Sequence, residues 1–384
     1  MGVRRARAVV GGGWSFVVLV VVVGALAVGA GLWVSDARTG TPGGTADPAQ
    51  AVATDVDPAH AAGDHAHGGA TEIPPSVDPE DLPLRTDRQE RAEFTLDGDV
   101  KVFTLTAEAV RWELLDDTWV TAWGYNGQVP GPEIWVDEGD RVRIELTNEL
   151  PAPTTIHWHG IDVPNEMDGV PGVTQDPIEP GERYVYEFEA QPTGTFWYHS
   201  HFDDARQQDM GLGGAFIIRG QNDADFDRDY VTLIDEWIRL PDGRNGWEGA
   251  AHAGHSPAEY NWFTINGKAF PATEDMVVTE GDRVRIRMIN AGYQAHPMHL
   301  HGRRFRVIAK DGALLDAPYL ADTVLIGAGE RYDVEFVAER PGDWMFHCHI
   351  PHHTQNDAVG PGGLISHVTY EGHRNRYQQE RDHE

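Results

Sequence analysis

Cysteine is almost absent from this chain, since Cys348 is the only one among 384 residues. A single cysteine excludes a disulfide within the chain, so the thiol is inert, a nucleophile or a soft metal ligand. It lies in the segment HCHIPHH, residues 347–353, between two histidines and close to two more. This setting favours a metal ligand.

Positive charge is scarce as well. Thirty lysine and arginine residues stand against 61 aspartate and glutamate residues, so the formal net charge is −31. This balance argues against nucleic acid as a partner. It predicts a solvated acidic surface that attracts cationic substrates.

Long apolar runs are missing except at the N-terminus, where residues 8–35 carry no charge and follow three arginines. As a helix this run would span about 42 Å, against about 30 Å for the hydrocarbon core of a membrane. We predict that residues 1–35 form a transmembrane anchor or, alternatively, a cleaved export signal. Both alternatives place the rest of the chain outside the cytoplasm.

Residues 36–90 are rich in Ala, Gly, Pro and Asp and show little apolar periodicity, which predicts a flexible linker. Its histidines His60, His65 and His67 are either solvated linker residues or a weak copper-capturing tract. Residues 372–384 are predicted to form a polar tail.

The body of the chain contains an internal repeat. EGDRVRI occurs at 138–144 and again at 280–286, HWHG at 157 matches HLHG at 299, and HSH at 199 matches HCH at 347. Two homologous domains follow, 91–220 and 228–371, each large enough to hold its own core.

Both halves consist of short β-branched and aromatic runs, such as RVRIELTN and YVYEFEA, between Asn-Gly, Pro-Gly and Glu-Gly-Asp turns. Helical periodicity is nearly absent. The pattern predicts an all-β fold with two tandem antiparallel Greek-key β-sandwich domains.

Four His-x-His doublets lie in these domains, two per repeat. Side chains at i and i+2 of a strand point to one face, so each doublet presents two imidazoles together and its middle residue to the other side. Four doublets in register offer eight converging imidazoles, which a purely structural role does not explain.

A strand through His347, Cys348 and His349 would join two metal sites back to back. Its thiolate needs two further imidazoles, and His353 and His296 lie outside the doublets. A His₂Cys set with a weak axial position is the blue-copper electron-transfer arrangement.

These motifs resemble the multicopper oxidases, a laccase-like family of linked cupredoxin domains, over residues 94–370. The resemblance implies four coppers and the reduction of dioxygen to water with electrons from a small reducing substrate: a phenol, an aromatic amine or a metal ion. It implies type 1 copper on His296, Cys348 and His353, and type 2 copper on His157 and His299. The type 3 pair would use His159, His199, His201, His301, His347 and His349.

The repeat places Thr154, Ser200 and Ala205 opposite the three type 1 residues, so the first domain is expected to hold no blue copper. The resemblance also implies that Asp168 feeds protons to the cluster and that His353 passes electrons from the donor. Asp168 could instead be a turn aspartate before Gly169.

The chain departs from the family near its C-terminus. The axial position falls on Ala358 or, with a longer loop, Leu364; neither coordinates, which favours a high copper potential. Thr354 stands where many relatives carry a glutamate, and His352 is interpreted as a loop residue. His252 and His255 either are surface loop residues or assist copper delivery.

Two alternatives stay open, a two-domain copper nitrite reductase and a non-catalytic copper-binding or homeostasis protein. The chain has only seven methionines, and this low content argues against a protein dedicated to binding cuprous ions. A cluster built from these motifs needs doublets from both domains, and the resemblance to two-domain members of the family implies a ring of three. We therefore predict a homotrimer in which domain one of one chain meets domain two of the next.

Overall fold

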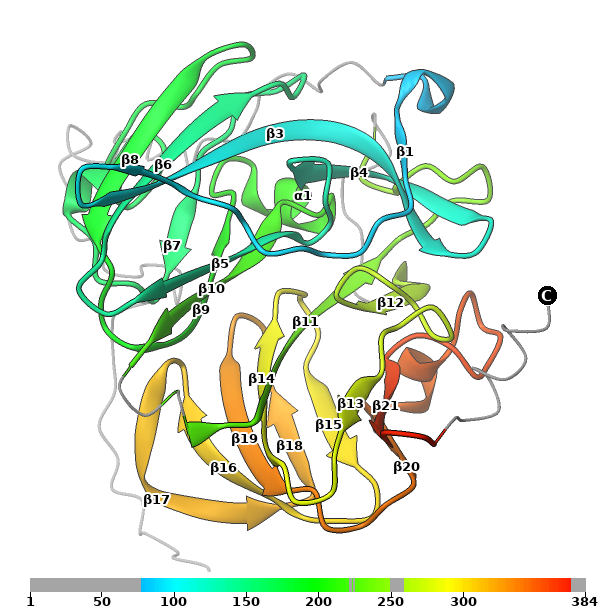
Figure 1. Cartoon of the computed structure of the whole chain (residues 1–384). Helices are drawn as coiled ribbons and strands as arrows, with labels where there is room; N and C mark the ends of the chain where they lie inside the picture. Colours follow the sequence, from blue (N-terminus) through cyan, green and yellow to red (C-terminus); the bar gives the residue numbers. More distant parts are fainter. Residues whose placement is uncertain (1–76, 221–222, 224, 249–258, 374–384) are drawn as a thin grey trace, which may run out of the picture. The chain divides into compact units, whose positions relative to one another are not determined.

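The computed structural model describes residues 77–220, 223, 225–248 and 259–373, and these residues form mainly β-strands (Figure 1). The predicted anchor or signal at 1–35, the histidines at 60, 65, 67, 252 and 255, and most of the tail lie outside the described residues. Among the described residues, no helix is long and apolar enough to cross a membrane.

The first half of the body is a β-sandwich, called here the N-terminal sandwich. One sheet contains β1 (Leu84–Arg85), β2 (Thr95–Asp97), β3 (Val100–Leu115), β4 (Thr118–Tyr125), β6 (Arg141–Asn148) and β8 (Arg183–Glu189). The other has the order β5 (Gly131–Asp137), β10 (Gly213–Arg219), β9 (Gly194–His199) and β7 (His157–His159). The short helices are η2 (Pro79–Asp81), η3 (Asn165–Met167) and α1 (Asp204–Asp209).

The second half is the C-terminal sandwich. One sheet has the order β12 (Trp262–Ile265), β11 (Arg228–Trp237), β14 (Arg283–Asn290), β19 (Arg331–Val337), β16 (Phe305–Lys310) and β17 (Ala313–Ala321). The other has the order β13 (Met276–Val278), β21 (Ile365–Tyr370), β20 (Asp343–Cys348), β15 (His296–Leu300) and β18 (Thr323–Ile326). The helix η7 (Pro351–Thr354) follows β20.

Each sandwich encloses its own apolar core, as the alternating strand patterns predict. In β6 the side chains of Val142, Ile144 and Leu146 are fully buried, whereas Arg141 and Glu145 are exposed. The period of two places the apolar residues on the face toward the opposite sheet.

The prediction of purely antiparallel sheets is wrong for several pairs. β3 runs parallel to β6, and β11 runs parallel to β14. The chain passes from β3 and β4 into β5 of the opposite sheet and returns as β6, so β6 enters in the direction of β3. The same crossing through β12 and β13 precedes β14.

The two sandwiches lie in one compact unit. Two apolar clusters join them, one around Trp112 and Trp237, the other around Trp197 and Leu233. The indole N–H of Trp112 donates to the carbonyl of Gly267 at 2.6 Å.

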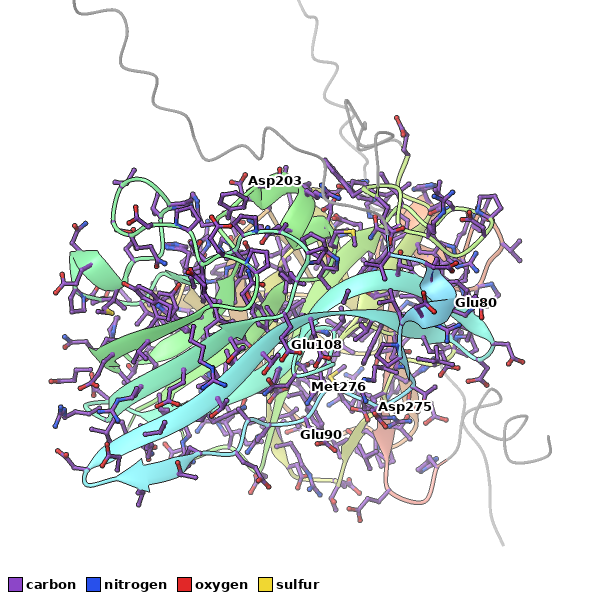
Figure 2. The ribbon with its side chains drawn as sticks, turned by 90° about the horizontal axis from the view of Figure 1, so that it is seen from above. Glu80, Glu90, Glu108, Asp203, Asp275 and Met276 are labelled. Atoms are coloured by element: carbon purple, nitrogen blue, oxygen red, sulfur yellow. The ribbon has the colours of Figure 1, made fainter. Side chains whose placement is uncertain are left out.

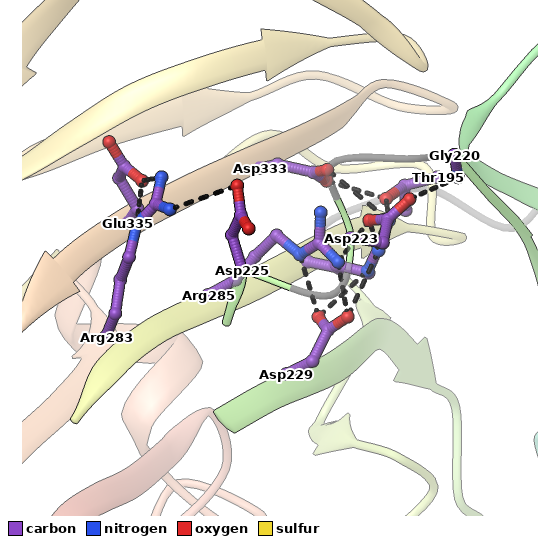
Figure 3. A network of polar contacts seen from close by, with 10 residues as sticks. Thr195, Gly220, Asp223, Asp225, Asp229, Arg283, Arg285, Asp333 and Glu335 are labelled. Atoms are coloured by element: carbon purple, nitrogen blue, oxygen red, sulfur yellow. Dashed lines mark hydrogen bonds and ion pairs between the residues drawn. The ribbon is translucent and has the colours of Figure 1, made fainter. Parts of the chain in front are cut away.

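A buried ion-pair network also crosses this boundary (Figure 3). The Arg287 side chain is 1% exposed and donates to Thr195 of the N-terminal sandwich at 2.8 Å and to Asp229 at 2.9 Å. Asp223 accepts a third bond at 2.7 Å. Because each buried charge has a partner, the desolvation cost of burial is offset at this boundary.

Residues 77–91, called here the strap, correct the predicted linker of 36–90. In the described part, β1 pairs with β3, and Arg88 forms an ion pair with Glu274 of the C-terminal sandwich. Figure 2 labels Glu80 and Glu90 within this segment. Its Ala, Gly and Pro content is low compared with the preceding residues, and its backbone finds partners on both sandwiches.

Candidate metal centres

The four doublets lie at the ends of neighbouring strands. His157 pairs with His199 between β7 and β9, and His299 pairs with His347 between β15 and β20. The register is therefore the same in both sandwiches. In three doublets the second histidine lies just beyond the strand, because β9, β15 and β20 end at His199, Leu300 and Cys348.

The middle residue of every doublet is buried, as expected from the alternation along a strand. These residues are Trp158, Ser200, Leu300 and Cys348, each at most 1% exposed. Trp158 and Leu300 belong to the cores of the two sandwiches. The imidazoles are therefore directed away from the core. They form two sets, one on each sandwich.

The N-terminal set consists of His157, His159, His199 and His201. Donor atoms of the first three lie within 4.8 Å of one another. The rings of His157 and His201 have centroids 5.6 Å apart. Burial and the Arg331 charge lower the pKa of His159 to about 4, so its imidazole is neutral at pH 7 and able to bind a metal ion.

The C-terminal set consists of His299, His301, His347 and His349. Nε2 of His301 lies 3.0 Å from Nε2 of His347, and the rings of His299 and His349 are 5.6 Å apart. His301 and His349 are exposed. Burial lowers the pKa of His347, which again favours the neutral ligand form.

Backbone carbonyls fix the tautomer of the paired histidines. Nδ1 of His157 lies 2.8 Å from the Asp168 carbonyl, and Nδ1 of His299 lies 2.7 Å from the Asp322 carbonyl. Nδ1 of His199 and Nδ1 of His347 likewise lie within hydrogen-bond distance of the carbonyls of Ser200 and Cys348. A carbonyl only accepts, so each Nδ1 carries the proton and Nε2 is left for a metal ion.

Asp168 lies beside His157, as the sequence predicts. Its carboxylate Oδ1 is 3.2 Å from Nδ1 of His157, and the side chain is 34% exposed. It therefore touches both a candidate ligand and solvent, which a residue carrying protons to this set requires.

A third group combines His296, Cys348 and His353, all buried. Nδ1 of His353 is 3.0 Å from Nδ1 of His296 and 3.5 Å from Sγ of Cys348. Nδ1 of His296 lies 3.8 Å from the same sulfur. Three lone-pair donors facing one another fit a metal ion of the His₂Cys type.

Electrostatics in this group favour metal binding over proton binding at the imidazole. Burial lowers the pKa of His353 to about 3. Burial also raises the pKa of the Cys348 thiol to about 12; a backbone hydrogen bond from Ile350 opposes this rise, and the charge of Glu236 adds to it. A metal ion must therefore displace a proton from sulfur but none from His353.

The loop after His353 separates the two axial alternatives. Ala358 has a φ of 64° and is exposed. Leu364 is fully buried, and its backbone bonds both Cys348 and His353. Ala358 is thus removed as an axial residue, whereas Leu364 lies next to the group.

Three contacts were not predicted from the sequence. Glu236 accepts a hydrogen bond from His296, the ring of Phe263 stacks on His353 at 4.4 Å, and Thr323 contacts His299. A signal for Glu236 was present, because Asp235 and Glu236 interrupt the apolar run YVTLIDEWI. Its partner, 60 residues away, was not predictable from spacing.

Comparison with known proteins agrees with this geometry. Residues 106–223 and 248–361 match family models described as "Multicopper oxidase". Oxidoreductase OpS5 of Beauveria bassiana is 36% identical over 261 residues, which cover 61% of this chain and 43% of that protein. Laccase-2 of Botryotinia fuckeliana is 36% identical over 257 residues, covering 60% and 43%. The chain thus spans less than half the length of these relatives.

A solved structure is similar over more of its length. The blue copper oxidase from Nitrosomonas europaea is 38% identical with a TM-score of 0.66, and the match covers 70% of this chain and 86% of that chain.

Proposed function

Because the chain belongs to the multicopper oxidase family, we propose that it oxidises small donors one electron at a time and reduces dioxygen to water. The observation that carries the proposal is the tripeptide His347–Cys348–His349. Its thiol joins the buried His₂Cys group, and its imidazoles belong to the C-terminal set. The tripeptide is a short covalent connection between the two.

The residues divide into three roles. His296, Cys348 and His353 would hold type 1 copper, His157 and His299 type 2 copper, and the other six doublet histidines the type 3 pair. Copper supplies one-electron redox chemistry at these sites. Asp168 would carry protons between solvent and the set that contains His157, and buried Leu364 would cover the axial side of type 1.

The alternatives are less well supported. Four doublets exceed what the simpler second site of a copper nitrite reductase needs. A storage protein does not require the carbonyl contacts that fix one tautomer at His157, His199, His299 and His347. Fixed tautomers serve a site of defined geometry.

Oxygen uptake tests the activity. The copper-loaded protein should become reduced under argon by a phenol, an aromatic amine, manganous ion or ferrous ion, and should then consume one dioxygen for every four electrons supplied. Donor reduction without oxygen uptake would contradict the oxidase function.

We further propose a homotrimer with clusters between subunits. In the described part of the chain, the ring contacts between doublet histidines stay within the N-terminal set or within the C-terminal set. His301 and His349 are exposed, so the C-terminal set lacks a cover. A heterologous contact that closes by rotation would bring the two sets together.

Complementation tests the assembly. One variant loses His157 and His159, another loses His299 and His301, and the two are mixed under conditions of proven subunit exchange. Clusters between chains restore oxidase activity, because some interfaces combine two intact sets. A mixture as inactive as its parents would show that each chain closes its own cluster.

Location outside the cytoplasm also stays a proposal, based on residues 1–35. N-terminal sequencing of the protein from the producing cells distinguishes a retained anchor from a cleaved signal. A cytoplasmic product with the full N-terminus would contradict both.

A further inference from the structure

Glu236 is fully buried beside His296 and is held by three donors. Oε1 lies 2.8 Å from Nε2 of His296 and 2.9 Å from the backbone N of Gln294. Oε2 accepts from the backbone N–H of Tyr293 at 2.9 Å. In the described part of the chain, the ion pairs of Glu236 include no lysine or arginine.

The loop around the carboxylate is shaped for it. A Cβ at Gly292 would overlap Oε2 of Glu236, so a side chain at this position would displace the carboxylate. The backbone N–H of Gly292 donates to Asn290 at 3.1 Å, and this bond holds the loop in place. Two backbone N–H groups therefore converge on one carboxylate, which fits the acceptor-only ionised form.

The carboxylate decides which nitrogen of His296 is free. Nε2 must donate to Oε1, so Nδ1 keeps its lone pair, and Nδ1 is the atom that faces Cys348 and His353. His353 has no such partner in the described contacts of its ring, which stacks on Phe263. The charge thus acts from the His296 side alone.

A buried negative charge favours the more positive state of a nearby group, because low dielectric leaves the interaction poorly screened. It therefore stabilises cupric over cuprous ion. Leu364, which cannot coordinate, acts in the opposite direction on the reduction potential.

We propose that Glu236 is a positioning residue of the type 1 site, which fixes the tautomer of His296 and lowers the reduction potential of the copper. The inference rests on the proposed function and deepens it. A lowered potential limits the donors to the more easily oxidised ones and increases the driving force for passing electrons to the cluster.

The substitution Glu236→Gln tests the charge at nearly constant shape. In the copper-loaded protein it should shift the equilibrium with a one-electron mediator at least tenfold toward cuprous ion, which is 59 mV for a one-electron couple. The blue band should persist with an altered wavelength. Urea unfolding of the variant measures any structural loss separately.

Asp235→Asn is the matched control. Asp235 precedes Glu236 on β11 and accepts from its backbone N–H at 2.9 Å. Burial and the Glu236 charge raise the pKa of Asp235 well above its usual range, which disfavours the charged form that asparagine removes. The mediator equilibrium should change less than threefold.

The outcomes separate the two proposals. A wild-type protein that binds copper without a blue band overturns the type 1 assignment, and the role of Glu236 with it. A blue wild type with an unchanged potential in Glu236→Gln overturns the role of Glu236 alone.

Should Glu236→Gln fail to fold, ¹⁵N NMR of the wild-type cuprous protein decides. A proton on Nε2 of His296 is expected, and Nε2 without a proton overturns the inference.

Discussion

Equivalent positions in the two sandwiches hold opposite kinds of buried polar group. In the C-terminal sandwich, His296, Cys348 and His353 direct lone pairs at one another. In the N-terminal sandwich, the repeat places Thr154 and Ser200 at the first two positions, and both donate to Oε1 of Gln207 at 2.8 and 2.5 Å.

The comparison shows what separates a metal site from a structural cluster. Each hydroxyl group carries its own proton and donates it to the same amide oxygen. This oxygen therefore has no lone pair free to bind a metal ion. The thiol and the two imidazoles of the other cluster can lose a proton and turn their lone pairs toward a metal ion. One sandwich keeps a self-sufficient polar core, and the other is able to bind a cation.

The largest effect is expected from a substitution in the group formed by His296, Cys348 and His353. Cys348→Ser should abolish the blue band and donor oxidation while the other three coppers stay, because His347 and His349 remain. Absorption spectra and copper analysis measure this. The control is Ser200→Ala at the equivalent position, which should leave the blue colour unchanged; a blue Cys348→Ser protein would refute the assignment.

Asp168→Asn should slow oxygen reduction at least tenfold, within the range of general acid–base effects, and leave anaerobic reduction of the blue copper nearly unchanged. Stopped-flow measurement of both steps checks this.

The control for Asp168→Asn is Asp322→Asn. The Asp322 carboxylate is farther from its histidine, at 3.9 Å from His299, and is more exposed. Equal slowing of both steps in Asp168→Asn would count against a proton role.

The pH dependence of metal uptake sharpens the comparison. The pKa of Cys348 is raised to about 12 by burial, so forming the thiolate at pH 6–8 releases one proton, and type 1 affinity should rise about tenfold per pH unit. His159, with a pKa near 4, is already neutral there and contributes no such slope. Chelator competition at pH 6, 7 and 8 measures the slope of copper affinity with pH. A type 1 affinity independent of pH would contradict the prediction.

The smallest effect concerns the N-terminal cluster. Gln207→Leu removes the shared acceptor of two buried hydroxyls and should cost about 1–3 kcal/mol of unfolding free energy without changing the copper spectra. Denaturant unfolding measures the loss. Gln208→Leu on the same helix, where the side chain is half-buried, should cost less; an equal cost would mean that helix packing dominates.

The sequence predicted the parts of the site that depend on local geometry. Alternation along a strand sufficed to bury Trp158 and Cys348 and to group the imidazoles, and the internal repeat predicted the shared register. The metal roles themselves stay predictions.

Contacts between distant segments could not be predicted in this way. Glu236, the carbonyls of Asp168 and Asp322, and the parallel pairing of β3 with β6 depend on how sheets pack and loops close. The two copies of the motif also have different surroundings. The Arg143 side chain of β6 is partly exposed, whereas Arg285 of the repeated EGDRVRI is buried and paired with Asp223 and Asp229.

The strap and the buried contacts between the two sandwiches determine the effect of proteolytic cleavage on the protein. A nick after Gly220 would cut the only covalent connection between the sandwiches. The halves would still be joined by Trp112, by Arg287 and by Lys268, which donates to the carbonyls of Thr86 and Glu113 at 3.2 and 2.7 Å. Fragment complementation should therefore be efficient: the two pieces would co-elute under native conditions and separate only in denaturant.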